Sequence, residues 1–360
     1  MKRTVLDFFA GSGLVSLALS PWFKTKWAND ISEDKYKVFA ANLPNVSFFL
    51  GSIEDVRGKD VPSADLSWGS FPCQDLSLAG KAEGLTGARS GLFRQWIRVM
   101  REMSERPPVA VAENVVGLLS LEGGRHYVEV HNALVSLGYR VGSLVLDAAR
   151  WVPQSRKRVF VVAARNDLDI RPLQADGPLW CHPESVRHAA RSVKEWVWWR
   201  LSEPPPRELT LEEIVDFSLP CDLPEKTRHL VSLLSPRHRA LVEEAVECGG
   251  RRVFPGYRRT RNHRQMLEIR NDGVAGCLRT PRGGSSRQTL LIVENGAIRS
   301  RLLSPDETAT LMGAPGFRLP GSYNDAYMAM GDGVAVPVAA WLAEHLLAPL
   351  SARTKQRAKR

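Results

Sequence analysis

The chain has 360 residues, of which 44% are apolar and 24% are charged, and its formal net charge at pH 7 is +10. This composition is typical of a globular protein with one large and one smaller domain. We find no apolar run of the length needed to cross a bilayer and no signal-peptide core at the start, which argues against membrane and secreted classes. The net positive charge favours a polyanionic partner.

The cysteines argue against two kinds of structural site. There are five, an odd number, and they are widely spread without a C-x-x-C pair. A disulfide framework and a structural zinc site are therefore not expected, and no metal site is predicted. A reducing cytoplasm fits this pattern.

In chain order, the first half of the sequence predicts strands that alternate with helices. Strands are expected at 4–9, 26–28, 46–50, 64–68, 109–112, 139–146 and 159–164, and helices at 15–19, 32–43, 91–104 and 125–137. Such alternation is typical of an α/β fold with a doubly wound, mostly parallel sheet, which holds ligands beyond the carboxyl ends of its strands. Phe9, Asp30, Cys73 and Glu113 all lie at such ends.

The first strand runs into a turn that contains Gly11 and Gly13. A strand, a glycine turn and a helix bring backbone N–H groups close to a nucleotide-like ligand, although a lone G-x-G also occurs in ordinary tight turns. Asp30, at the tip of the second strand, is placed to accept hydrogen bonds from both hydroxyls of a ribose. The alternative is that Asp30 only begins the next helix, for which Ser32 is the predicted cap.

Cys73 lies in the segment Pro72-Cys73-Gln74, just after a predicted strand. A thiolate on an exposed loop is a plausible nucleophile, whereas a buried cysteine would act only as a small apolar side chain. Glu113 is placed to supply a carboxyl group at the same edge of the sheet, or could be a surface carboxylate. Arg156 and Arg158 are two residues apart before an apolar run, so on a strand they would face the same side.

Five segments together resemble the DNA cytosine-5 methyltransferase family, bacterial and phage type. They are Phe9-Ala10-Gly11-Ser12-Gly13, Pro72-Cys73-Gln74, Glu113-Asn114-Val115, Gln154-Ser155-Arg156-Lys157-Arg158 and Gly331-Asp332-Gly333-Val334, in the family's order and spacing. The resemblance covers almost the whole chain except about 168–276. It implies a Rossmann-like fold that uses S-adenosyl-L-methionine, releases S-adenosyl-L-homocysteine and flips cytosine out of double-stranded DNA.

The resemblance also implies roles for single residues. Cys73 would add to cytosine C6, Glu113 would bind N3, and Arg158 would hold O2 while Arg156 braces the site. The donor-binding residues would be Phe9, Gly11, Gly13, Asp30, Ile31, Ser52, Ile53, Pro72, Asp332 and Val334. Ser52 replaces a frequent family acid that contacts the adenine amino group, and Asp332 stands where asparagine is usual.

The variable middle of the chain is the expected DNA reader. Residues 251–264 contain no acid, and arginines between aromatic residues suit phosphate contact and guanine reading, although a solvated basic face is the alternative. The residues expected to contact DNA are Gln74, Ser77, Arg251, Arg252, Arg258, Arg259, Arg261 and Arg282. Trp196, Trp198 and Trp199 are expected in packing rather than in base stacking.

These assignments predict the domain organisation. We expect a catalytic and cofactor-binding domain at 1–167, a target-recognition domain at 168–320, a segment at 321–350 that returns to the first domain, and a disordered basic tail at 351–360. The glycine-rich loop 75–93 is expected to close over the base and to be mobile without DNA. We expect a cytoplasmic monomer, in a bacterium or phage-encoded, with a cognate restriction endonuclease as a further partner. The rival hypotheses are an RNA cytosine-5 methyltransferase and a DNA-binding relative that has lost catalysis.

Overall fold

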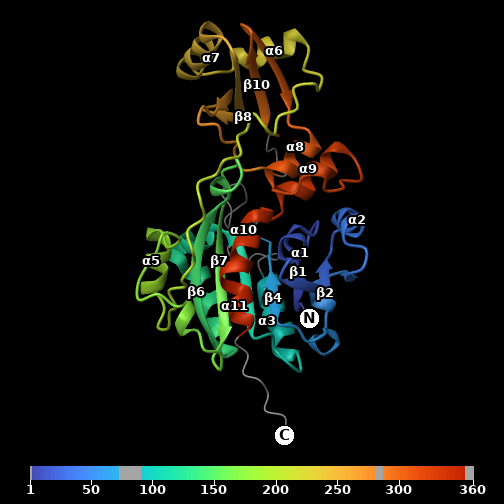
Figure 1. Cartoon of the computed structure of the whole chain (residues 1–360), viewed down its shortest axis with the longest axis vertical. Coiled ribbons are helices and arrows are strands. Elements are labelled where there is room, and N and C mark those ends of the chain that lie inside the picture. The colour runs from blue at the N-terminus through green and yellow to red at the C-terminus, as the bar shows by residue number, and fades with distance from the viewer. Residues whose placement is uncertain (1, 73–90, 280–286, 353–360) are drawn as a thin grey trace. The chain divides into compact units, whose positions relative to one another are not determined.

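The computed structural model describes residues 2–72, 91–279 and 287–352, which form two compact units (Figure 1). Unit 1 comprises Met1–Asp147, Lys157–Pro204 and Val338–Arg360, and unit 2 comprises Ala148–Arg156 and Pro205–Pro337. Each unit has its own sheet and its own apolar core.

Unit 1 is built on a seven-stranded sheet with the order β3-β2-β1-β4-β5-β7-β6. Its strands are β1 (Arg3–Phe8), β2 (Phe23–Asp30), β3 (Ser47–Leu50), β4 (Leu66–Gly69), β5 (Val109–Val115), β6 (Tyr139–Asp147) and β7 (Lys157–Arg165). The neighbours from β3 to β5 pair in parallel, and β7 pairs antiparallel with both β5 and β6. The predicted mostly parallel sheet is therefore confirmed.

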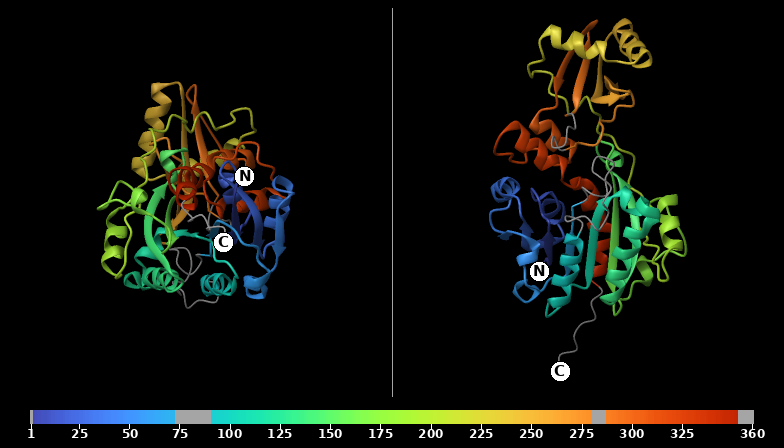
Figure 2. Two further views of the ribbon diagram at one scale, coloured as in Figure 1. Left: turned by 60° about the horizontal axis from the view of Figure 1, so that its bottom comes forward. Right: turned by 180° about the vertical axis from the view of Figure 1, so that it is seen from behind.

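Helices cover both faces of this sheet (Figures 1 and 2). They are α1 (Leu14–Leu19), α2 (Glu33–Asn42), α3 (Leu92–Glu102), α4 (Arg125–Ser136), α5 (Glu184–Arg191), α10 (Val336–Leu342), which begins in unit 2, and α11 (Ala348–Ser351). Alternate strand residues such as Leu6 and Val161 pack with Trp96 of α3 and Val130 of α4, because successive side chains of a strand point to opposite faces. Ser32 accepts a hydrogen bond from the backbone of Lys35, so it caps α2 as predicted.

The segment 168–204 belongs to unit 1, although we expected it in the second domain. Its backbone reaches the sheet, where Val197 N donates to Val141 O at 3.0 Å, and Trp199 Nε1 donates to Val162 O at 3.0 Å. Gly142 permits this approach, because a Cβ there would lie 1.9 Å from the carbonyl oxygen of Val197. Trp199 is completely buried, so its predicted role in packing is confirmed.

Unit 2 contains a four-stranded antiparallel sheet with the order β11-β10-β8-β9. Its elements are α6 (Pro224–Ser232), α7 (Pro236–Cys248), β8 (Arg251–Arg261), β9 (Arg264–Ile269), β10 (Thr289–Glu294), β11 (Ala297–Leu302), α8 (Pro305–Leu311) and α9 (Tyr323–Gly331). Leu230 of α6 and Val242 of α7 pack with Phe254, Leu267 and Leu291 of the sheet in one core. Residues 321–337 also belong to unit 2, so the chain returns to unit 1 at Val338 rather than at residue 321 as we expected.

One stretch of the described residues, Tyr323–Ser351, is long and apolar enough to cross a membrane by length and composition, which we did not expect from the sequence. In its most apolar window 56% of the residues are buried inside the protein, and the core helices of globular proteins pass the same test. The stretch is therefore weak support for a membrane span.

Candidate active site

The described residues of unit 1 that we predicted to be catalytic or donor-binding gather at one edge of its sheet. The carboxyl ends of parallel strands lie at the same edge, and here these ends are Phe8 of β1, Asp30 of β2, Gly69 of β4 and Val115 of β5. The antiparallel strand β7 begins at this edge, with Arg158 paired opposite Val115. The fold thus brings together residues that lie far apart in the sequence.

Glu113 and Arg158 form a buried ion pair at this edge. Arg158 Nε lies 3.1 Å from Glu113 Oε1, and the two side chains are 15% and 9% exposed. The register explains the contact, because Glu113 is paired with Phe160 and Arg158 is two residues along the same face of β7. Removing one partner of such a pair leaves an uncompensated buried charge, at a cost of roughly 3–5 kcal/mol.

Asn114 links this pair to the segment that leads to Cys73. Its side-chain amide donates to the carbonyl oxygen of Phe71 at 3.2 Å, and it is almost completely buried. Asn114 thereby fixes the backbone two residues before Cys73. We did not predict this role, although the position of Asn114 beside Glu113 was a signal that could have indicated it. The other predicted residues Cys73, Gln74, Ser77 and Arg282 lie outside the described residues.

Arg156 does not share a strand face with Arg158, and that prediction was wrong. The strand β7 begins at Lys157, and Arg156 belongs to unit 2. Within unit 2 its guanidinium donates to the carbonyl oxygens of Leu278, Gly331 and Gly333, and to the sulfur of Cys277. Since Arg156 is only 2% exposed, these contacts make it a structural link between two segments of unit 2.

The glycine turn has two glycines with different surroundings. Both have positive φ, +56° at Gly11 and +91° at Gly13. A Cβ at Gly13 would lie 2.8 Å from atoms of Phe39 and Leu43, so glycine is required there for packing against α2. A Cβ at Gly11 would meet only Lys35, at 3.9 Å, so space for a ligand remains beside that backbone. Phe9 also has a positive φ of 58°, a strained conformation for a bulky residue.

Asp30 connects the glycine turn to the start of α2. Its Oδ2 accepts a hydrogen bond from Gly11 N at 2.9 Å, and its Oδ1 accepts one from Ser32 N at 2.9 Å. Each carboxylate oxygen has a second lone pair, so this arrangement leaves acceptor capacity for a ligand. Both of our alternatives for Asp30, the helix start and the ligand contact, are compatible with this geometry.

The ends of β2 and β3 expose apolar side chains. Ile31 is 73% exposed and Leu50 is 43% exposed. Leu50 pairs with Asp30 across the sheet, so both residues lie at the predicted donor edge. We did not predict Leu50, and only its exposure identifies it. Ser52 accepts a hydrogen bond from Glu54 N, and Ile53 is buried in the core of unit 1.

A buried carboxyl group lies beneath the glycine turn. Asp7 is completely buried, and its Oδ2 accepts a hydrogen bond from Ser16 Oγ at 2.6 Å. Burial raises the pKa of Asp7 from 3.8 to about 7, and repulsion from Asp30 adds to the increase in pKa. Sequence patterns did not indicate this residue, because an acid inside a predicted strand can face either side.

Two predicted donor-binding residues, Asp332 and Val334, belong to unit 2. Asp332 is the C-cap of α9 and is exposed, whereas Val334 is buried. They flank Gly333, whose carbonyl oxygen accepts a hydrogen bond from Arg156.

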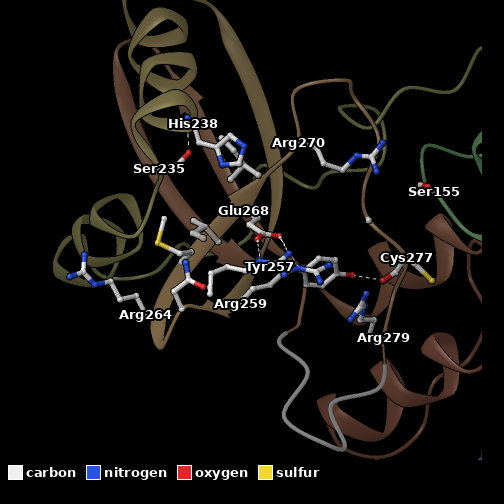
Figure 3. A pocket seen from close by; sticks show the side chains of 16 residues that line it. Ser155, Ser235, His238, Tyr257, Arg259, Arg264, Glu268, Arg270, Cys277 and Arg279 are labelled. Atoms are coloured by element: carbon white, nitrogen blue, oxygen red, sulfur yellow. Dashed lines mark hydrogen bonds and ion pairs between the residues drawn. The ribbon is translucent and has the colours of Figure 1, made fainter. Parts of the chain in front are cut away.

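The arginines predicted to contact DNA do not form one cluster. Arg251 pairs with Glu294 and lies over the ring of Phe217, and it begins β8 together with Arg252. Arg258, Arg259 and Arg261 lie at the other end of β8, about 20 to 34 Å along the strand at its usual rise per residue. This second end borders a hollow of about 1040 Å³ on unit 2 (Figure 3).

The comparisons with known proteins identify the family. The family model of the C-5 cytosine-specific DNA methylases matches residues 3–348. The chain belongs to this family. It is a DNA cytosine-5 methyltransferase, and the family activity requires a methyl donor and DNA as substrate.

Several bacterial methylases resemble this methyltransferase. The Type II methyltransferase M.HhaI of Haemophilus parahaemolyticus is 27% identical over 357 residues, which cover 95% of this chain and 93% of that protein. M.Bsp6I of a Bacillus species is 24% identical over 352 residues, with 95% and 98% covered. M.NgoFVII of Neisseria gonorrhoeae is 35% identical over 170 residues, and this match spans only 46% of the chain and 45% of that protein.

Among solved structures, the Entamoeba histolytica methyltransferase EhMeth superimposes with a TM-score of 0.63 at 15% identity, covering 97% of this chain and 99% of that one. The Dnmt2 methyltransferase of S. pombe gives a TM-score of 0.61 at 16% identity, with the same coverage. These two likenesses support the fold of the methylase.

Proposed function

We propose that this methylase transfers a methyl group to C5 of a cytosine extruded from duplex DNA, with Cys73 as the nucleophile. The observation that carries the proposal is the buried pair of Glu113 and Arg158 at the sheet edge, next to Asn114, which binds the backbone of Phe71. A carboxyl and a guanidinium group are thus fixed beside the chain that leads to Cys73. An extruded base is needed because a thiolate must approach C6 from above the ring plane.

Each side chain has a chemical task in this proposal. The sulfur of Cys73 forms a bond to C6, and the electron pair of the C5–C6 double bond makes C5 nucleophilic. The carboxyl group of Glu113, in its protonated form, donates a hydrogen bond to N3, and Arg158 donates one to O2, so that both stabilise the negative charge that builds on the ring. After methylation, the C5 proton leaves to water and the S–C6 bond breaks, which restores the aromatic ring and the thiolate.

The proposed donor is S-adenosyl-L-methionine, which supplies an electrophilic methyl group on a sulfonium and leaves as S-adenosyl-L-homocysteine. Three features of the sheet edge support this choice: the space beside Gly11, the carboxylate of Asp30, and the exposed apolar side chains of Ile31 and Leu50. A carboxylate suits ribose hydroxyls, and exposed apolar side chains suit the face of an adenine. We keep Phe9, Gly13, Ser52, Ile53, Pro72, Asp332 and Val334 as proposed donor-binding residues.

We propose that unit 2 reads the DNA sequence and that the loop 75–93 closes over the extruded base. The loop prediction concerns mainly residues outside the described part of the chain. Support for the role of unit 2 comes from the arginines of β8 and β9, because arginine suits both phosphate contact and base reading.

The names of the relatives suggest the biological setting. They are Type II methyltransferases of bacteria, so we propose that this methylase acts in the bacterial cytoplasm beside a cognate restriction endonuclease. We keep the expectation of a monomer, which light scattering of the purified protein would test.

The test of the proposed function uses a labelled methyl donor and three substrates: duplex DNA, single-stranded DNA and RNA. We expect label in duplex DNA, at C5 of cytosine, as read by nucleoside analysis. Cys73→Ala should abolish transfer while duplex binding persists. Transfer only to RNA would establish the rival RNA activity, and duplex binding without transfer by the unmodified protein would favour the relative that has lost catalysis.

A further inference from the structure

The strands β8 and β9 form a hairpin whose tip is exposed and polar. The turn residues Asn262 and His263 both have positive φ, 47° and 61°, as a two-residue primed turn requires. In the register, Tyr257 pairs with Glu268 and Arg259 pairs with Met266. Since directly paired residues of antiparallel strands point to the same face, Tyr257, Arg259, Arg261 and Glu268 share one face of the hairpin.

On this face one glutamate holds two arginines. Glu268 Oε2 lies 3.0 Å from Arg259 Nε, and Glu268 Oε1 lies 2.6 Å from Arg261 Nε. Arg259 uses its Nε, and its terminal nitrogens make no hydrogen bond to any other residue in the described part of the chain. Arg261 uses its Nε and also donates from Nη2 to Glu268 Oε2, over a longer distance of 3.4 Å. We name this cluster of Arg259, Arg261 and Glu268 the arginine clamp.

The arginine clamp lines the hollow of unit 2 (Figure 3). Arg264 from β9, Arg270 beyond it and Arg279 also line the hollow, so its lining contains five arginines and one glutamate. Arg270 is paired with Asp272. The three residues of the clamp are each about one-third or more exposed. The hollow therefore presents an excess of guanidinium donors to a large anionic partner.

We propose that the arginine clamp reads guanines in the recognised DNA sequence, with Glu268 as the residue that positions both guanidinium groups. This inference rests on the proposed function of unit 2 as a DNA-contacting domain, and it adds Glu268 as the positioning residue and the joint action of Arg259 and Arg261.

The chemistry of the clamp favours guanine over the other bases. A guanidinium that holds its Nε on a carboxylate, as Arg259 does, can offer its two terminal nitrogens side by side, which matches the O6 and N7 acceptors of guanine in the major groove. Arg261 would exchange its long Nη2 contact with Glu268 for the base to do the same. Two long side chains would lose much rotamer freedom on binding, and Glu268 restricts that freedom beforehand. Arginines in an exposed ion pair add little to stability, so orientation is the main effect of the pair.

The carboxyl group of Glu268 is ionised when it positions the two arginines. The hydrogen bond from Arg261 holds the pKa of the Glu268 carboxyl below its usual value, and the charges of Arg261, Arg259 and His238 lower the pKa further. The carboxylate therefore carries its charge at neutral pH.

The experiment is selection from a random duplex library by the full-length protein, with bound sequences and methylated sequences read separately. We expect the unmodified protein to select a sequence that contains at least two guanines. Arg259→Lys and Arg261→Lys should each reduce the preference for guanine at one position by roughly 5- to 150-fold, because a lysine loses the bidentate contact. Glu268→Gln should reduce the preference at both positions at once.

The matched controls use an exposed arginine–glutamate pair of α6 in the same unit. Arg228 and Glu225 form an ion pair outside the hollow, so Arg228→Lys and Glu225→Gln should leave the selected sequence unchanged. Thermal unfolding of every variant would verify folding. An unchanged selection by Glu268→Gln, an equal loss with Glu225→Gln, or a selected sequence without guanine would overturn the inference.

The bound sequences and the methylated sequences, read separately, distinguish a failure of this inference from a failure of the proposed function. Methylation of duplex DNA by the unmodified protein, with base preferences that do not depend on Glu268, would refute the clamp and retain the activity. Clamp-dependent selection without methylation would retain the clamp and refute the proposed activity.

Discussion

The sheet edge of unit 1 and the hairpin of unit 2 both join arginine to glutamate, but they differ in exposure. At the sheet edge, Glu113 and Arg158 are buried, and each has the other as a close charged partner. On the hairpin, Glu268 forms ion pairs with two arginines, both of which remain exposed to solvent. Burial fixes a charge pair and makes its loss costly, which suits chemistry on a single base, whereas exposure leaves donors available for a large partner.

The largest expected effect concerns the two glutamates. Glu113→Gln should reduce methyl transfer by roughly 10²- to 10⁴-fold, because it removes an acid–base group from the proposed site. The matched change Glu268→Gln should leave the maximal rate on the preferred sequence within a few-fold of the unmodified protein. Initial rates at saturating duplex and donor would measure both. Equal losses for the two variants would break the distinction between chemistry and recognition.

The next effect separates Arg156 from Arg158. Arg156→Ala would leave buried carbonyl oxygens of Leu278, Gly331 and Gly333 without their donor, at about 1–3 kcal/mol for each such group. We expect the free energy of unfolding to fall by about 3 kcal/mol or more, as urea denaturation would measure. Arg251→Ala is the control in the same unit and should change stability little. Normal stability with lost turnover for Arg156→Ala would return Arg156 to the catalytic chemistry.

The smallest effect is a pH dependence at Asp7. Its folded pKa of about 7 exceeds the ordinary value of 3.8, so between these values the folded state binds more protons than the unfolded state. The contribution of Asp7 to stability is therefore complete below about pH 4 and is lost as the pH rises to about 7. The unfolding free energy of the unmodified protein should fall by about 1–3 kcal/mol between pH 5 and pH 8 because of Asp7. Asp7→Asn should remove this fall.

Asp60→Asn is the control for this pH effect, because Asp60 lies on the surface and pairs with Arg57. It should leave the pH profile unchanged. A profile for Asp7→Asn that matches the unmodified protein would show that Asp7 does not titrate in this range.

The sequence predicted the strands and the alignment of functional residues at their ends well, because periodic apolar runs and local turn residues determine both. Glu113 and Arg158 meet because their strands, β5 and β7, are neighbours in one sheet. The family motifs indicated a shared role for the two residues. Arg156 was placed wrongly, because a two-residue spacing implies a shared face only if both residues lie on the strand, and β7 begins one residue later.

Tertiary contacts determine what the sequence did not reveal. The segment 168–204 packs on unit 1 through the close approach of Val197 to Gly142, which no local pattern encodes. Leu50 is identified only by its exposure in the folded structure, and Asp7 is identified only by its burial there. Glu268 lies outside the acid-free stretch that marked the basic region, and only the register of β8 and β9 brings it to Arg259 and Arg261.

The most direct measurement is covalent trapping on duplex DNA that contains 5-fluorocytosine, in the presence of S-adenosyl-L-methionine. Fluorine at C5 does not leave as a proton does, so elimination stops and the enzyme remains attached to the base. We predict a stable adduct that carries the methyl group and that maps by peptide mass to Cys73, with none formed by Cys73→Ala. An adduct at another residue, or methylation of ordinary cytosine by Cys73→Ala, would contradict the account.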